Sequence, residues 1–256
     1  MNDLDINMKC LKNICDNFKL NKTQSEFCYR CYVNGLEKYK QRLKNIDFMN
    51  FHNVLDAGSG YGQWSIALSL LNENVTGIEY DKLRVGVSKR IIETLGVNNV
   101  SFSEGSIEDI KFENNYFDAV FCYSVIFQTQ WKQSIGEFSR VLKKGGRIYI
   151  NSNSYGWVFY NIIKNPNKNS EFSPRATAIK TLLNTLKSNL GFNYYGEIVI
   201  NPNSIVEEAK RHKLKLISLN GDGLTCIQSA TCQVLPFFID KYLGLKCVYE
   251  IVLEKE

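Results

Sequence analysis

The sequence has no run of apolar residues approaching the roughly 20 that are needed to cross a membrane. Its opening residues MNDLDINMKC carry acids where a secretory signal has a basic region, and no apolar segment follows them. Lysine and arginine number 31 against 26 acids, but they are scattered, so the net charge of +5 comes without a basic block typical of nucleic-acid binding. We therefore expect a cytoplasmic protein without a membrane partner, and we do not expect nucleic acid as a partner.

Histidine is scarce, with two residues in the whole chain. His52 comes just before the first predicted strand, at the sheet edge opposite a ligand crevice, and His212 lies in the charged run EEAKRHK. We expect both to be structural or solvated, so a histidine general base is not part of the predicted chemistry. The 256 residues also contain no internal repeat, low-complexity tract or linker, which favours a single domain.

Cysteine is fairly abundant, with eight residues. In a reducing cytosol we expect thiols or metal ligands and not disulfides. The spacing of Cys10, Cys15, Cys28 and Cys31 loosely resembles a structural zinc site. However, Cys28 and Cys31 fall inside one predicted helix, and Cys10 and Cys15 would lie about 140° apart on the helix before it. We therefore expect buried thiols and no metal.

Secondary-structure patterns divide the chain at about residue 50. Apolar residues recur at helical spacing in residues 1–50, and Thr23 with Glu26 has the spacing of a capping box that would begin the second helix. From residue 53, short apolar runs alternate with helical stretches of ten or more residues. These runs are NVLDA, NVTGIEY, NVSFSEG, FDAVFCY and GRIYINS. The alternation predicts an α/β fold with a doubly wound, mainly parallel, Rossmann-like sheet of seven strands.

The alternation is interrupted after Ser154. Residues 155–204 are rich in Tyr, Asn and Lys and contain three of the four prolines, so we interpret them as an inserted cap over the substrate. Further along we predict a helix at 205–212, a strand at 214–219, a helical stretch at 237–243 and a last strand at 246–253. The predicted parts are N-terminal helices (1–50), a cofactor-binding half (53–154), the cap (155–204) and a C-terminal part that completes the sheet (205–256).

The sharpest motif is VLDAGSGYG at residues 54–62, where a buried strand runs into glycines and then into a helix. Glycines there allow positive φ and close approach of backbone N–H groups to a ligand. A dinucleotide fingerprint needs its third glycine five positions after the first, but that position is Gln63 and the third glycine is Gly62. Glu79 ends the next strand, where a carboxylate could take both hydroxyls of a ribose. The pattern favours a nucleoside ligand without phosphates.

With these residues the sequence resembles the class I S-adenosylmethionine-dependent methyltransferases. Beside the glycine motif, GIEYD resembles their ribose-binding strand end and SFSEGSIEDI the segment along the adenine. FDAVFCYSVIF resembles their fourth motif, and EFSRVLKKGGRIYI the helix, turn and strand that follow. The resemblance covers residues 53–151 motif by motif and the C-terminal strand order more loosely. It implies S-adenosylmethionine as the cofactor and S-adenosylhomocysteine as its product.

The same resemblance assigns individual residues to the cofactor. Asp56 would fix the glycine loop, Glu79 would hold the ribose, and family members usually have Asp where this chain has Ser106. Glu108 or backbone alone would then hold the exocyclic amine of the adenine. Gly58 and Gly60 would lie against the methionine part, Ser106 and Ile107 would flank the adenine, and Cys122 and Tyr123 would sit beside the sulfonium. The complete predicted set is Asp56, Gly58, Ser59, Gly60, Glu79, Tyr80, Ser106, Ile107, Cys122 and Tyr123.

No catalytic residue is assigned. Methyl transfer from a sulfonium is an in-line displacement, so alignment of the acceptor and exclusion of water can supply much of the catalysis. Tyr123 and Gln128 are candidates for orienting the acceptor, with packing and capping as their alternative roles. Asn151, Ser152 and Asn153 reach the same edge of the sheet and could also face the acceptor, or they could simply form a polar turn.

The leading hypothesis is methyl transfer to a small molecule at oxygen or nitrogen. The aromatic and basic side chains of residues 155–204 would suit an anionic or sugar-bearing acceptor, such as a phosphate- or nucleotide-linked sugar. A protein or RNA methyltransferase is one alternative, and a catalytically inactive cofactor-binding sensor or partner subunit is another. The oligomeric state is left open.

Overall fold

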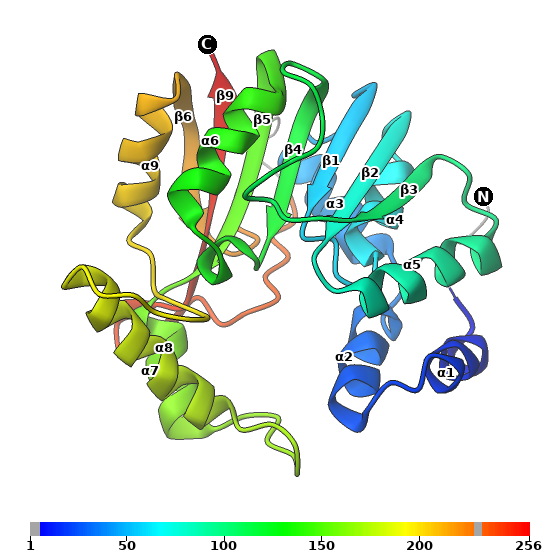
Figure 1. The fold of residues 1–256 in the computed structure, drawn as a ribbon, viewed down its shortest axis with the longest axis horizontal. Helices are drawn as coiled ribbons and strands as arrows, with labels where there is room; N and C mark the ends of the chain where they lie inside the picture. The colour runs from blue at the N-terminus through cyan, green and yellow to red at the C-terminus, as the bar shows by residue number, and fades with distance from the viewer. Residues whose placement is uncertain (1–5, 228–231) are drawn as a thin grey trace.

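A computed structural model describes residues 6–227 and 232–256 of the chain. Its main sheet contains β1 (Asn53–Ala57), β2 (Asn74–Glu79), β3 (Val100–Glu104), β4 (Phe117–Tyr123), β5 (Leu142–Asn153), β6 (Leu214–Gly221) and β9 (Val248–Lys255). The strand order is β3-β2-β1-β4-β5-β9-β6, and β9 is antiparallel to both of its neighbours (Figure 1). The predicted mainly parallel sheet of seven strands is therefore confirmed.

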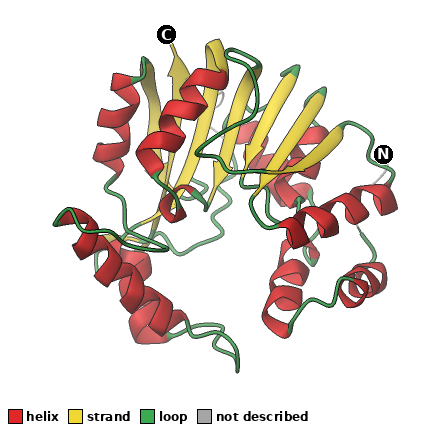
Figure 2. Cartoon of the chain, viewed as in Figure 1, coloured by secondary structure: helices red, strands yellow, loops and turns green. Residues whose placement is uncertain are grey.

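Helices cover both faces of the sheet (Figure 2). One face packs against α4 (Gln63–Ser69) and α5 (Lys82–Leu95), and the same core also includes residues of α1 (Met8–Asn17), α2 (Lys22–Tyr32) and α3 (Glu37–Asn45). The other packs against α6 (Trp131–Val141) and α9 (Pro202–Arg211). Successive residues of a strand point to opposite faces, so Phe121 lies in the first core and Val120 in the second.

The segment predicted to be a cap, residues 155–204, contains two helices, α7 (Tyr155–Lys164) and α8 (Pro174–Asn189), which follow β5 at the carboxyl ends of the parallel strands (Figure 1). The last residues of the predicted cap belong to the core instead, because Ile198 and Ile200 are buried in the same cluster as residues of α9. Tyr249 donates a hydrogen bond from its hydroxyl to the Ile200 carbonyl at 2.9 Å, which joins this segment to β9.

The prediction of a helical stretch at residues 237–243 is wrong. These residues lead into a small hairpin of β7 (Lys241–Tyr242) and β8 (Leu245–Lys246). Leu243 and Gly244 between them have φ of 51° and 79°, and the type I′ hairpin turn requires positive φ at both positions. The apolar residues of this segment have helical spacing, but the segment forms part of a hairpin and not a helix.

The start of α2 also differs from the prediction. Asn21 and Gln24 form the capping box, since the Asn21 side chain accepts from the Gln24 N–H at 2.9 Å and the Gln24 side chain accepts from the Asn21 N–H at 3.0 Å. Thr23 and Glu26 already lie inside the helix. An asparagine satisfies the free N–H groups of a first helical turn as well as a threonine does. The sequence therefore contains two patterns typical of a capping box, and the one that starts at Asn21 is the one formed.

The cysteines were partly mispredicted. Cys226 and Cys232 form a disulfide, and their Cα atoms lie 6.1 Å apart, within the usual range for such a bond. The expected buried free thiols are Cys15, Cys28, Cys31, Cys122 and Cys247. Cys10 is also a free thiol, but it is exposed, so the expectation of burial is wrong for this residue. Within residues 6–227 and 232–256 no group of three or more His, Cys, Asp and Glu side chains could hold a metal. None of the helices described is long and apolar enough to cross a bilayer.

Candidate functional site

The glycine loop lies at the point where the strand order reverses, between β1 and β4, which is where open α/β sheets bind ligands. Gly58 has φ of +84°, and its N–H donates to the Ile78 carbonyl at 2.8 Å. A Cβ at Gly58 would lie 2.5 Å from a methyl carbon of Val125, in the loop after β4. Both backbone conformation and packing therefore require glycine at this position.

Glu79 lies directly beside this loop. Its carboxylate accepts hydrogen bonds from the Gly60 N–H at 2.9 Å and from the Asp81 N–H at 3.0 Å, and the residue is only 8% exposed. A carboxylate has about four acceptor positions, so about two remain for a ligand. The structure thus brings together the loop and the acid that the sequence assigned to one nucleoside.

Two further polar side chains lie under the loop. Asp56 is buried and accepts a hydrogen bond from the Ser65 hydroxyl at 2.5 Å. Burial raises the pKa of Asp56 to about 7, with the Ser65 hydroxyl opposing and the nearby Glu79 charge adding to the shift. The Ser59 hydroxyl is buried and has no hydrogen-bond partner among the described residues. Buried polar atoms without a partner are rare in folded proteins, so this hydroxyl calls for an explanation.

On the side predicted for the adenine, the residues differ in their burial and in the hydrogen bonds that they already make. Ile107 is buried in the core between β1 and α6, and the Ser106 hydroxyl accepts from the Glu108 N–H at 3.1 Å. The Glu108 carboxylate accepts from the Gln130 N–H at 2.6 Å, so it already caps the start of α6. Tyr80 is 81% exposed and points into solvent. Ile107 and Ser106 remain the residues of this set that line the end of β3.

Cys122 and Tyr123 lie on opposite faces of β4. Cys122 is fully buried in the second core, and burial raises the pKa of its thiol above the usual range. Tyr123 lies on the first face, stacked with Phe121 and Tyr149 at centroid distances of 6.2 and 6.4 Å. Gln128 is exposed at the end of a short 3-10 turn, η1 (Ile126–Gln128), so the structure does not bring it next to Tyr123.

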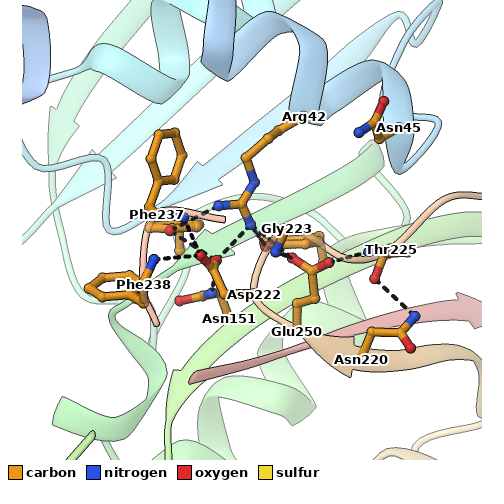
Figure 3. Close-up of polar contacts among 12 residues, drawn as sticks. Arg42, Asn45, Asn151, Asn220, Asp222, Gly223, Thr225, Phe237, Phe238 and Glu250 are labelled. Carbon is orange, nitrogen blue, oxygen red and sulfur yellow. Dashed lines mark hydrogen bonds and ion pairs between the residues drawn. The ribbon is translucent and has the colours of Figure 1, made fainter. Parts of the chain in front are cut away.

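A buried polar network is centred on Arg42 (Figure 3). The hydroxyl of Tyr123 belongs to this network. Arg42 comes from α3, and its Nη2 donates to Asp222 at 2.7 Å, to Glu250 at 2.8 Å and to the Tyr149 hydroxyl at 3.0 Å. Its Nη1 donates to the Tyr123 hydroxyl at 3.3 Å, and that hydroxyl in turn donates to Asp222 at 3.2 Å. One cation therefore faces two carboxylates inside the protein.

The network also anchors the loop between β6 and β7. The second oxygen of Asp222 accepts from the backbone N–H groups of Phe237 and Phe238 at 2.7 and 3.2 Å (Figure 3). Glu250 accepts from the backbone N–H groups of Gly223 and Thr225 at 3.0 and 2.8 Å. The sequence pattern did not single out these residues. The available signal was Glu250, an acid within the apolar run of the last strand, because a buried acid needs a partner.

The three polar residues at the end of β5 have different surroundings. Asn151 donates to Asp222 at 3.0 Å and accepts from the Ser124 hydroxyl at 2.9 Å, so it connects the network to the loop after β4. Ser152 is completely buried. Asn153 is only 3% exposed, and neither its amide nitrogen nor its amide oxygen has a hydrogen-bond partner in the described parts of the chain. Asn153 therefore carries a buried amide without a partner at this edge of the sheet.

The N-terminal helices and the cap are joined on the carboxyl side of the sheet. The Thr23 N–H in α2 donates to the Glu171 carboxylate at 3.0 Å, and the Asn169 side chain donates to Glu26 at 3.0 Å. Residues 169–171 belong to the connection between α7 and α8, which extends toward α2 (Figure 1). The two parts thus meet across the side on which the glycine loop lies.

The two histidines lie away from this site. His52 is exposed at the amino end of β1 and contacts Glu73 at 2.5 Å. His212 follows α9 and lies 3.3 Å from Glu208. Their positions agree with the expectation that they take no part in the chemistry.

Comparison with known proteins gives a consistent result. A family model described as "Methyltransferase domain" matches residues 50–211. "Uncharacterized methyltransferase YcgJ" of Bacillus subtilis (strain 168) is 32% identical over 109 residues, covering 42% of this chain and 43% of that protein. "Demethylmenaquinone methyltransferase" of Staphylococcus aureus (strain JH9) is 30% identical over 149 residues, covering 50% of this chain and 61% of that protein. The chain thus spans about half the length of these relatives.

Solved structures share the architecture. The crystal structure of the YcgJ protein from Bacillus subtilis has a TM-score of 0.55 at 17% identity, covering 86% of this chain and 99% of that one. A geranyl diphosphate C-methyltransferase from Streptomyces coelicolor A3(2), in complex with Mg²⁺, geranyl diphosphate and S-adenosyl-L-homocysteine, has a TM-score of 0.58 at 14% identity, covering 84% and 77%. At such identities the similarity shows the fold alone.

Proposed function

Because the chain belongs to the class I S-adenosylmethionine-dependent methyltransferases, we propose that it transfers a methyl group from S-adenosylmethionine to a small-molecule acceptor. The observation that carries the proposal is the Glu79 carboxylate, buried at the end of β2 and bonded to the glycine loop with acceptor positions left over. This arrangement supports a nucleoside with free ribose hydroxyls. S-adenosylmethionine, when bound, supplies a methyl group activated by a sulfonium.

The residues of the chain would divide the binding between them. Glu79 would accept hydrogen bonds from the ribose, and Ser59 would offer a hydroxyl that has no partner within the described chain. Gly58 and Gly60 permit close approach of the backbone, and Ile107 offers an apolar surface for a base. Cys122 and Tyr123, near the end of β4, would lie beside the sulfonium.

The site favours an acceptor that needs no strong base. Burial raises the pKa of the Tyr123 phenol well above its usual value, and the hydroxyl is hydrogen-bonded to Asp222. The Cys122 thiol is held protonated by burial in the same way. We therefore propose a nitrogen or an acidic hydroxyl as the methylated atom, with a phosphate- or nucleotide-linked sugar as one acceptor class. Asn153 is the residue best placed to orient it, since its amide is unpaired.

Binding of S-adenosylhomocysteine to Glu79 variants tests the cofactor proposal. Glu79→Ala should weaken the affinity about ten- to a hundredfold, because a bidentate contact of about 1.5 to 3 kcal/mol is lost. Glu104→Gln is a matched control, because Glu104 is the register partner of Glu79 on β3 and is exposed. Isothermal titration calorimetry on folded variants gives the answer, with NAD and ATP as ligands that should not bind.

Turnover is tested separately. The wild-type protein should convert S-adenosylmethionine to S-adenosylhomocysteine in the presence of a metabolite extract, and mass spectrometry should find a metabolite heavier by one CH₂ group.

Unchanged affinity in folded Glu79→Ala would show that the ribose lies elsewhere. Tight cofactor binding without turnover on any fraction would favour the sensor or partner-subunit alternative.

A further inference from the structure

Helix α8 exposes several large apolar side chains, although its Leu182 packs against the core. Ile179, Leu183, Leu186 and Leu190, the last of them the C-cap residue, are 45%, 56%, 56% and 64% exposed. At about 100° per residue these four positions fall within about 60° of one another, so they form one stripe along the helix. Single exposed leucines are ordinary, whereas an aligned stripe of this kind marks an interaction surface.

The opposite side of α8 is the more polar one, and it is held against the protein by hydrogen bonds. Thr185 accepts from the Val199 N–H at 2.8 Å, and Asn184 donates to the Tyr195 and Glu197 carbonyls at 2.8 and 3.1 Å. These bonds fix the rotation of the helix. The apolar stripe therefore cannot turn inward, and it lies on the outer side of α8, where its side chains are exposed to solvent.

The charged residues of α8 itself have one sign. From Phe172 to Gly196 the chain contains no aspartate or glutamate, whereas Arg175, Lys180 and Lys187 are exposed. Glu197 follows this segment, interacts with the charge of Lys180 and accepts a hydrogen bond from the Thr181 hydroxyl at 3.3 Å, on the polar side of the helix. Lys180 and Lys187 lie on the same flank of the stripe, about 80° to 100° from Ile179. Pairing of α8 with a second copy would bring like charges together without a carboxylate in this segment. An anionic surface is complementary to it.

We propose that α8 docks the protein on an anionic lipid membrane. The apolar stripe would lie at the boundary between headgroups and acyl chains, and the lysines would lie at the level of the lipid phosphates. Phe192 and Tyr195 follow the helix and are 64% and 86% exposed, which suits the interfacial role of aromatic side chains. The expectation of no membrane partner came from the missing transmembrane run, and surface docking needs none.

Docking would have a defined orientation. Figure 1 shows α8 at the carboxyl side of the sheet, the same side as the glycine loop and the junction between α2 and the cap. The membrane would therefore lie on the side from which an acceptor reaches the site. The inference itself rests on the exposure and charge of α8 and not on the proposed reaction.

Co-sedimentation with lipid vesicles tests the proposal on the full chain. The protein should bind vesicles of phosphatidylcholine mixed with phosphatidylglycerol much better than vesicles of phosphatidylcholine alone, and added salt should weaken the binding. Leu183→Ser with Leu186→Ser should weaken it about tenfold or more. Lys180→Gln with Lys187→Gln should weaken it about ten- to thirtyfold. All four side chains are exposed, so melting temperatures should stay close to the wild-type value.

Val33→Ser is the matched control, because Val33 is 57% exposed at the end of α2, outside the cap. It should bind anionic vesicles as the wild type does. No binding to anionic vesicles, or binding that the α8 variants leave unchanged, would overturn the proposal. A dimer of the purified protein that Leu183→Ser with Leu186→Ser dissociates would also overturn it, because the stripe would then be occupied by a second copy.

Discussion

Replacing Arg42 by methionine should destabilise the fold by about 3 to 5 kcal/mol, the usual loss when one partner of a buried ion pair is removed. Arg42 is 4% exposed, and the Asp222 and Glu250 side chains beside it are each 1% exposed. Methionine fills much of the same space without the charge. Tyr123 and Tyr149 keep an acid to donate to, so the main loss is the compensation of two buried carboxylates.

A double-mutant cycle distinguishes this charge effect from a simple packing defect. Adding Glu250→Gln to Arg42→Met should destabilise by less than the sum of the single changes, because one unpaired charge disappears. Urea denaturation followed by circular dichroism measures all three variants.

Arg90→Met is the control for Arg42→Met. Arg90 pairs with Glu93 on α5 at 3.0 Å, but the two side chains are 59% and 62% exposed. Such surface pairs contribute about 0 to 1 kcal/mol. A loss below about 1 kcal/mol in Arg42→Met, or a loss that adds in full to that of Glu250→Gln, would refute the view that Arg42 balances buried charge.

Two other predictions concern the core and the disulfide. Burial raises the pKa of Asp56 to about 7 from an ordinary value of 3.8. The stability that its protonation provides is therefore complete below pH 3.8 and is lost as the pH rises through 7. Asp56→Asn should therefore gain about 2 to 3 kcal/mol relative to wild type between about pH 5 and 8, and parallel pH profiles in urea denaturation would contradict this. Cys226→Ser with Cys232→Ser should lose about 2 kcal/mol under oxidising conditions. Dithiothreitol should lower the melting temperature of the wild type and leave that variant unchanged, and an insensitive wild type would contradict the prediction.

The parallel half of the sheet could be predicted because each of its strands is a short apolar run with its own turn signals. The glycine loop and Glu79 could be predicted for a related reason, since both lie within one strand-helix-strand unit. The capping box and the hairpin could not, because Asn21 competed with Thr23 and because the turn at Leu243 and Gly244 depends on backbone angles that the apolar spacing does not reveal.

The Arg42 network was beyond the sequence pattern for another reason. Arg42 lies 180 residues from Asp222 and 208 residues from Glu250, and nothing local connects them. The same network includes Tyr123, a candidate for orienting an acceptor with packing as its alternative role, because the Tyr123 hydroxyl is bonded to Arg42 and Asp222. Long-range pairing of charges is decided by the completed fold.

The position of β9 has a consequence for synthesis of the chain on the ribosome. β9 is inserted between β5 and β6, and β6 pairs with no other strand of the main sheet. Until residues 248–255 have been made, a nascent chain has Arg42 without Glu250, and the edge of β5 lacks the strand that will cover it. An uncovered strand edge invites pairing with other chains. We therefore expect the nascent protein to need protection from aggregation until β9 emerges, and ribosome-bound chains that stop before residue 248 should be readily digested by protease.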